Sequence, residues 1–207
     1  MGLVQTMPPM EKTFKKIANK LAFLKDTSEL MLDLAYSSLL LNSRALAEEV
    51  HMLEEQVDEL HTEFEFLVLS SGFKPEESKD FLGLIRLGVV TEKIADAAAE
   101  IAEVVLRELE PHPVLRLVIE EAEETVTQAW VSEKSILVGK TIRDAKIPEE
   151  TGMWVLALKR GKNWLRPKPE TVIKAGDVLI ASGYAEGVKD LKRLASGSLL
   201  KRSRLAP

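Results

Sequence analysis

The sequence predicts a two-domain α+β protein, in which an antiparallel three-helix bundle is followed by a small α/β domain. Between residues 11 and 110 there is one proline, and the apolar residues recur at helical spacing. Most prolines and the short β-branched runs lie beyond Pro111. We therefore expect a helical domain over residues 10–112, a connector helix over 113–124, a small domain over 125–197 and a flexible tail over 198–207.

The first predicted helix runs almost without a break from Glu11 to about Leu41. The segment Asp26-Thr27-Ser28 leaves a second possibility open, because these residue types often cap a new helix. We favour the near-continuous helix.

The second predicted helix is capped by Asn42 or Ser43 and runs to about Leu69. Ser71-Gly72 ends it, because glycine suits the left-handed conformation of a helix end. The third begins at Pro75 and extends to about Leu109, before Pro111 stops it. Its large apolar residues are expected to face the core: Leu87, Ile94, Ile101 and Val105.

In the second domain the spacing of apolar residues shortens to the two-residue alternation of β-strands. The expected strands are 125–131, 153–158, 164–165 and 178–181, with a hairpin turn at Arg160-Gly161-Lys162-Asn163, a helical turn over 141–145 and a closing helix over 185–194. A core of this size is marginal by itself, so we expect the domain to form a homodimer.

Composition excludes several classes of function. A net charge of −5 lacks the basic footprint of a nucleic-acid-binding protein. The absence of cysteine rules out thiolate zinc sites and cysteine nucleophiles. The most apolar stretch, residues 30–41, is too short for a membrane span. We expect a cytoplasmic protein that reaches the inner face of a membrane only through a partner.

Two pairs of carboxylates are the sharpest chemical feature. Glu54 and Asp58 lie four residues apart on the second helix, and Glu92 and Asp96 repeat the spacing on the third. Each pair stacks on one helix face, and antiparallel neighbours can bring both pairs around a hard or borderline cation. His61 and Glu65 extend the first face, and Glu103 extends the second. The alternative is that these are ordinary solvated acidic faces.

No catalytic constellation is evident. Val138-Gly139-Lys140-Thr141 imitates the end of a phosphate-binding loop, but Lys134 stands where that loop needs a glycine. His51 and His112 are interpreted as surface residues. We therefore expect a protein that is not an enzyme.

Residues 135–194 carry, in order, GKTIRD, a TG before an apolar strand, KRG, PKP and KAGDVLI. This segment resembles the TrkA C-terminal domain, also called the RCK C-terminal domain. The resemblance implies a small α/β dimer that senses a ligand and regulates a cation channel or transporter.

Some members of that family bind a cyclic dinucleotide between two such domains, through an arginine four residues before the glycine that leads into the strand. Pro148 occupies this position here. The resemblance makes Pro148, Met153, Pro167 and Pro169 the candidate ligand contacts.

The segments AEEVHMLEEQVDEL and TEKIADAAAEIAE, which contain both carboxylate pairs, resemble PhoU. PhoU-like helical bundles bind metal clusters through such carboxylates, which implies a divalent or iron-type ion at Glu54, Asp58, Glu92 and Asp96. One three-helix unit is present where full PhoU has two, which again favours a dimer.

These resemblances predict a cytoplasmic regulatory subunit of a cation channel or transporter, with potassium as the expected ion and an integral membrane protein as partner. The alternative is a PhoU-type metal-binding adaptor of phosphate transport. A metal-dependent hydrolase is a third hypothesis.

Overall fold

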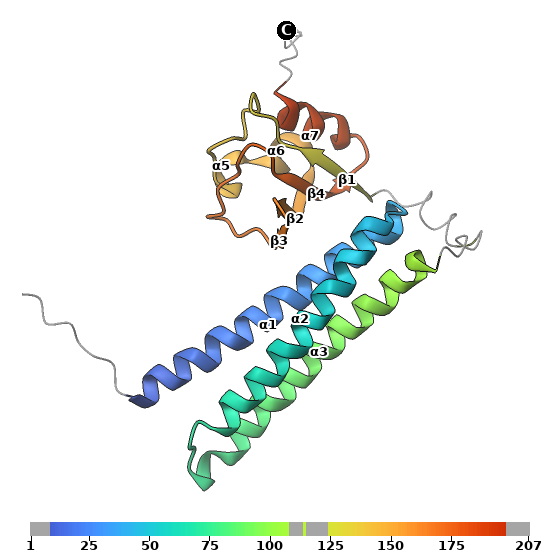
Figure 1. Ribbon diagram of the computed structural model, residues 1–207. Coiled ribbons are helices and arrows are strands. Elements are labelled where there is room, and N and C mark those ends of the chain that lie inside the picture. The colour runs from blue at the N-terminus through green and yellow to red at the C-terminus, as the bar shows by residue number, and fades with distance from the viewer. Residues whose placement is uncertain (1–8, 108–113, 115–123, 198–207) are drawn as a thin grey trace, which may run out of the picture. The chain divides into compact units, whose positions relative to one another are not determined.

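The computed structural model describes residues 9–107, 114 and 124–197, which divide into two compact units (Figure 1). We call residues 9–107 the helical unit and residues 124–197 the mixed unit. The expected tail and almost all of the expected connector helix lie outside the described residues. Within the described ranges, no helix is both long and apolar enough to cross a membrane.

The helical unit contains three long helices, as predicted. They are α1 (Pro9–Leu40), α2 (Arg44–Leu69) and α3 (Ser78–Leu106), with the short 3₁₀ helix η1 (Pro75–Glu77) before α3. Short turns reverse the chain between them, so α2 and α3 lie side by side along most of their length (Figure 1). Because of this antiparallel packing, residues that are far apart in sequence lie opposite one another at the same position along the bundle axis.

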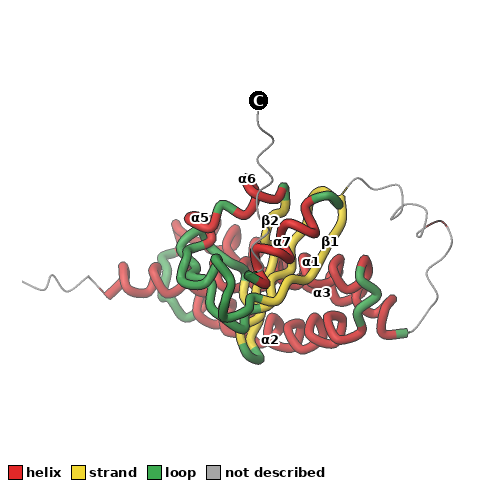
Figure 2. The backbone as a smooth tube through the Cα atoms, turned by 90° about the horizontal axis from the view of Figure 1, so that it is seen from above, coloured by secondary structure: helices red, strands yellow, loops and turns green. Residues whose placement is uncertain are grey.

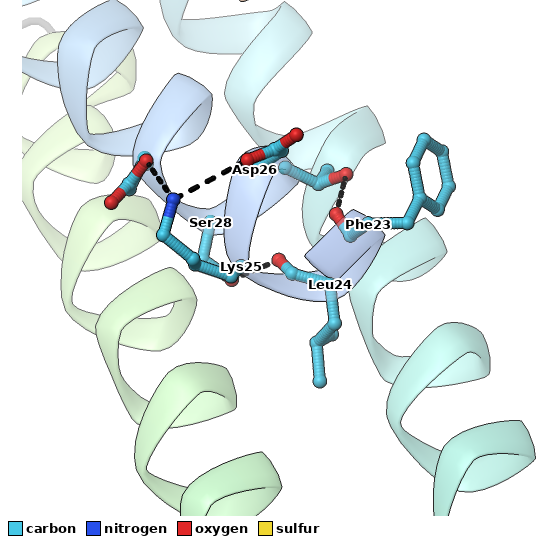
Figure 3. A network of polar contacts seen from close by, with 7 residues as sticks. Phe23, Leu24, Lys25, Asp26 and Ser28 are labelled. Atoms are coloured by element: carbon cyan, nitrogen blue, oxygen red, sulfur yellow. Dashed lines mark hydrogen bonds and ion pairs between the residues drawn. The ribbon is translucent and has the colours of Figure 1, made fainter. Parts of the chain in front are cut away.

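Helix α1 continues through the segment that could have capped a second helix. Ser28 Oγ donates to Leu24 O at 3.0 Å and Thr27 Oγ1 donates to Phe23 O at 2.8 Å. Both hydroxyls therefore bond back one turn instead of capping the backbone ahead. Lys25 Nζ adds an ion pair with Glu29 at 2.9 Å (Figure 3). The near-continuous helix is confirmed.

The ends of the helices follow the predicted signals. Ser43 caps α2, with its side chain accepting a hydrogen bond from Leu46 N at 3.4 Å. Gly72 adopts a φ of 70° just after α2 ends. The Glu77 carboxylate accepts from Lys74 N at 2.8 Å at the start of η1. The predicted end of α3 at Leu109 lies outside the described residues.

The inward face of α3 agrees with the prediction at Val105, which is buried, and differs from it at Leu87 and Ile94. Leu87 and Ile94 are 51% and 41% exposed, whereas Ala95, Ala98 and Ala102 are buried. The backbones of α2 and α3 approach closely, and most of the buried residues of α3 are small. A cluster of Ile17, Phe64, Val68 and Phe81 supplies the large side chains of one part of the core.

The mixed unit is built on a four-stranded antiparallel sheet with strand order β1-β4-β2-β3. Figure 2 shows the strands of this sheet in yellow, with β1 and β2 labelled. The strands are β1 (Glu124–Trp130), β2 (Met153–Arg160), β3 (Asn163–Leu165) and β4 (Val178–Tyr184). The predicted strands and the hairpin turn are confirmed, with Arg160 paired to Asn163. β1 begins at Glu124, which was expected to belong to the connector helix.

Three helices complete the mixed unit: α5 (Ile142–Ala145), α6 (Ile147–Thr151) and α7 (Gly187–Ser196). The sequence predicted α5 and α7, but not α6. The core between helices and sheet comprises Ala129, Val131, Leu137, Ala145, Ile147, Met153, Leu158, Ile173, Leu179, Ala181, Leu191 and Ala195.

Two glycines let elements of this unit approach one another closely. A Cβ at Gly187 would collide with the carbonyl oxygen of Thr151, and a Cβ at Gly183 would collide with that of Gly152. The start of α7 and the end of β4 therefore pack directly against the backbone that joins α6 to β2.

Candidate functional site

The carboxylates singled out in the sequence gather where α2 packs against α3. One oxygen each of Glu54, Asp58 and Asp96 lies within 4.8 Å of the others. Glu54 and Asp58 are one turn apart on α2, and the antiparallel packing places Asp96 opposite them. We call these three residues the acidic triad.

Glu92, the fourth predicted ligand, lies beside the acidic triad without being part of its tight group. Partial burial, and then the negative charges of Asp96 and Asp58, raise the pKa of the Glu92 carboxyl above its ordinary value. The charge of His61 acts in the opposite direction. Repulsion among these carboxylates is relieved by a bound cation or by a proton.

The geometry fits a hard cation. Oxygen ligands lie about 2.0–2.6 Å from Mg²⁺ or Ca²⁺, so two ligands on opposite sides of the ion are about 4–5 Å apart. The oxygens of the acidic triad already lie within 4.8 Å of one another. The all-oxygen donor set suits Mg²⁺, Ca²⁺ or Mn²⁺ better than a soft metal.

His61 and Glu65 continue this face along α2, as predicted. His61 Nε2 lies 3.5 Å from Glu65 Oε1, and it is buried without a hydrogen-bond partner among the described residues. The imidazole also lies near Gly88 of α3. The nitrogen therefore has unused hydrogen-bonding capacity next to the acidic cluster.

His51 lies at the surface, as interpreted, with 45% of its side chain exposed, but it is not without a partner. Its Nε2 lies 3.1 Å from Glu103 Oε2, and Glu103 Oε1 accepts a hydrogen bond from Arg107 Nε at 2.8 Å. The Arg107 hydrogen bond, followed by that of His51, lowers the pKa of the Glu103 carboxyl. Glu103, predicted to extend the α3 face, is thus bridged to α2.

A groove of about 580 Å³ connects this bridge to the acidic triad. Its lining includes His51, Glu54, Asp96, Glu100 and Arg107. The groove opens beside the carboxylates, so an ion or small ligand can reach Glu54 and Asp96 from solvent.

The predicted ligand residues of the mixed unit are spread over three places. Pro148 is half-buried in the first turn of α6, and Pro167 and Pro169 follow β3. Pro169 O accepts a hydrogen bond from Arg143 N at 3.0 Å, which ties this segment to α5. Met153 has no exposed surface and belongs to the core, so a ligand at the surface does not touch it in this conformation.

The sequence that imitates a phosphate-binding loop has a local structural role. Thr141 caps α5 by accepting from Asp144 N at 3.0 Å and donating to Asp144 Oδ2 at 2.7 Å. Gly139, with a φ of 82°, donates its backbone N–H to Ile173 O at 2.9 Å. The Gly139 hydrogen bond joins two loops of the mixed unit.

Comparison with known proteins identifies both units. The PhoU domain model matches residues 21–105 and the TrkA-C domain model matches residues 126–196. Both resemblances drawn from the sequence are confirmed.

Two relatives come from Methanocaldococcus jannaschii. Potassium channel protein 1 is 36% identical over 76 residues, which cover 36% of this chain and 23% of the relative. Probable potassium channel protein 2 is 36% identical over 83 residues, which cover 39% of this chain and 24% of the relative. The chain therefore spans less than a quarter of either relative.

Solved structures with similarity include the RCK C domain of the potassium transport protein KtrA in complex with cyclic diadenosine monophosphate. It is 27% identical, covers 39% of this chain and 94% of its own, and has a TM-score of 0.32. The RCK_C domain dimer of S. agalactiae BusR, in complex with the same ligand, is 28% identical to this chain. The match covers 33% of this chain and 90% of the BusR chain, with a TM-score of 0.30.

Proposed function

We propose that this chain, which contains a PhoU domain and a TrkA-C domain, is a regulatory, ligand-sensing subunit of a potassium channel or transporter. The observation that carries the proposal is the 36% identity to two potassium channel proteins. The chain works at the cytoplasmic face of the membrane as a homodimer and regulates a pore supplied by an integral membrane partner. Its role is regulatory, and no reaction is assigned to it.

The sensing step uses both units. A small ligand, such as a cyclic dinucleotide, binds between two mixed units near Pro148, Pro167 and Pro169. A ligand that binds one arrangement of the dimer more tightly shifts the population toward it. A coupling free energy of about 1–3 kcal/mol is enough to alter the state of the partner.

Recovery of the membrane partner tests this function. The tagged chain is expressed in its native host, membranes are solubilised in several mild detergents, and co-purified proteins are identified by mass spectrometry. We expect a potassium channel or transporter to be enriched over a tag-only control. Recovery of no transporter in any detergent would contradict the proposal.

A functional measurement complements the recovery. Deletion of the gene should change the potassium uptake or release of the host, and the wild-type chain should restore it. An unchanged potassium flux in the deletion strain would contradict regulation of potassium transport, even where a membrane protein co-purifies.

The acidic triad favours a second candidate, a PhoU-type metal-binding adaptor of phosphate transport. In this case the metal ion at Glu54, Asp58 and Asp96, with Glu92 beside it, is the signal-bearing group. Phosphate uptake in the deletion strain separates the two candidates, because the adaptor changes phosphate transport and leaves potassium transport unchanged. A hydrolase would instead show substrate turnover that disappears in Asp58→Ala and Asp96→Ala.

A further inference from the structure

Helix α3 carries an exposed apolar stripe with the spacing of a coiled-coil seam. Its members are Gly83, Leu87, Val90, Ile94, Ala97, Ile101 and Val104, which recur at alternating intervals of four and three residues. We call these seven residues the α3 stripe. Val90 is 55% exposed and Leu87 51%, and Ile94 and Val104 are 41% and 39% exposed.

The stripe is distinct from the face that α3 uses inside its own unit. The buried residues of α3 are Phe81, Gly88, Thr91, Ala95, Ala98, Ala99, Ala102 and Val105. The α3 stripe borders this buried face on one side. Asp96, the member of the acidic triad that α3 carries, lies on the opposite side of the buried face. Apolar residues that recur every 3.5 residues on average keep facing a second helix along the whole length of a coiled coil. The apolar residues of an ordinary surface helix recur every 3.6 residues instead.

We infer that the α3 stripe is the contact with a second copy of this chain, formed by two α3 helices packed antiparallel about a two-fold axis. This inference goes beyond the proposed function and does not depend on it. An isologous contact requires a self-complementary surface. The α3 stripe is self-complementary in more than one register, and we take the register that also places Lys93 near Glu100 of the partner subunit. Leu87 then faces Val104 of the partner subunit, Val90 faces Ile101 of the partner subunit, and Ile94 faces Ala97 of the partner subunit.

The charges that flank the seam support this register. Lys93 and Glu100 each lie immediately before a stripe residue, at the position from which coiled-coil helices form ion pairs with their partner. The register places Lys93 near Glu100 of the partner subunit, and the two-fold axis produces this pair twice. Arg86 comes near Arg107 of the partner subunit, but Arg107 already donates to Glu103 at 2.8 Å in its own helix.

Single cysteines test the pairing directly, because the chain has none of its own. With a rise of about 1.5 Å per residue, the two copies of residue 97 are offset by about 4.5 Å along the axis, those of residue 104 by about 25 Å, and those of residue 83 by about 37 Å. We expect a short bis-maleimide to link Ala97→Cys into a covalent dimer and to leave Val104→Cys and Gly83→Cys monomeric on a denaturing gel.

Each other outcome overturns the inference. Linkage at all three positions means a parallel pair or random collision, and linkage at none means that the α3 stripe does not face another copy. The mass of the assembly alone cannot test the α3 contact, because the proposed homodimer through the mixed unit would give a dimer mass by itself.

A second variant tests the chemistry of the contact. Val90→Glu, added to Ala97→Cys, places a charge in the seam at a residue that is more than half exposed, so the helical unit should keep its circular dichroism. We expect at least a tenfold loss of linkage, and Val90→Leu should retain the wild-type yield. Equal linkage in Val90→Glu and Val90→Leu would show that the seam is not apolar in solution.

Discussion

Arg160 donates two hydrogen bonds to the buried carboxylate of Asp177, from Nε to Oδ1 at 2.9 Å and from Nη2 to Oδ2 at 2.7 Å. Asp177 Oδ2 also accepts from Lys174 N at 2.8 Å, and Asp177 is 1% exposed. The hydrogen bonding to Asp177 raises the pKa of the Arg160 guanidinium. This pair fastens the end of β2 to the turn that precedes β4.

Removal of the guanidinium should destabilise the mixed unit. Arg160→Met leaves the Asp177 carboxylate buried without its cation, and we expect a loss of roughly 3 kcal/mol in the free energy of unfolding. The measurement is denaturation followed by tryptophan fluorescence, since all three tryptophans lie in the mixed unit. Lys189→Met, at an exposed position of α7, is the matched control. A loss of the same size in both variants would contradict a specific role of the pair.

Loss of one carboxylate of the acidic triad should weaken metal binding. We expect Asp58→Asn and Asp96→Asn each to reduce the affinity for Mn²⁺ or Ca²⁺ by at least about tenfold, since even the loss of a residue that only orients a metal ligand causes a loss of this size. Titration calorimetry and elemental analysis of the purified protein measure it. Glu55→Gln, an exposed acidic neighbour on α2, should bind as the wild type does. Metal-free wild-type protein that also fails to bind added ions would rule the site out.

Two glycines of α3 should respond in opposite directions to the same substitution. A Cβ at Gly88 would lie 2.7 Å from Phe64 Cε1 and 2.9 Å from Cδ1, whereas a Cβ at Gly83 meets nothing within 4 Å. Gly88→Ala should destabilise the helical unit by about 1–3 kcal/mol through overpacking. Gly83→Ala should stabilise it by about 0.5–1 kcal/mol through helix propensity.

Circular dichroism at increasing denaturant measures both variants, because the signal comes mainly from the long helices. Stabilisation by Gly88→Ala would mean that Phe64 moves aside without cost. The close packing of α2 on α3 at this point would then not be a constraint on the bundle.

The stability of the helical unit should depend on the ionisation of Asp33. Burial raises the pKa of its carboxyl from 3.8 to about 6. The folded state therefore holds the proton more tightly than the unfolded state, so this contribution to stability is complete below pH 3.8 and is lost as the pH rises to about 6.

Asp33→Asn removes the cost of burying the charge. With allowance for the exposed part of the carboxyl, we expect a gain of about 1–2 kcal/mol at pH 8 and a smaller gain at pH 4.5, measured by denaturant unfolding. The exposed Asp80→Asn is the control. An equal gain at both pH values would mean that ionisation is not the cause.

Much of the helical unit could be predicted because its signals are local. Ser43 and Pro75 mark helix starts through short-range hydrogen bonding and a fixed φ, and a four-residue spacing is enough to stack Glu54 on Asp58. The meeting of these carboxylates with Asp96 followed from the antiparallel arrangement of neighbouring helices.

The features that were missed depend on contacts across the chain. Leu87 and Ile94 were placed inward because large apolar residues usually fill a core, but most of the buried positions of α3 hold small residues instead. His51 finds its partner Glu103 at a separation of 52 residues, which no local pattern reveals. Helix α6 has five residues and begins at Ile147, too short for a helical period to show.

The backbone contacts of Gly183 and Gly187 have a mechanical consequence. Neither position has room for a side chain, so the backbones of β4 and α7 are in direct contact with the end of α6 and the residue that follows it. Because the start of α7 touches the backbone of Thr151 at the end of α6, we expect a displacement of α6, where Pro148 lies, to displace α7 as well.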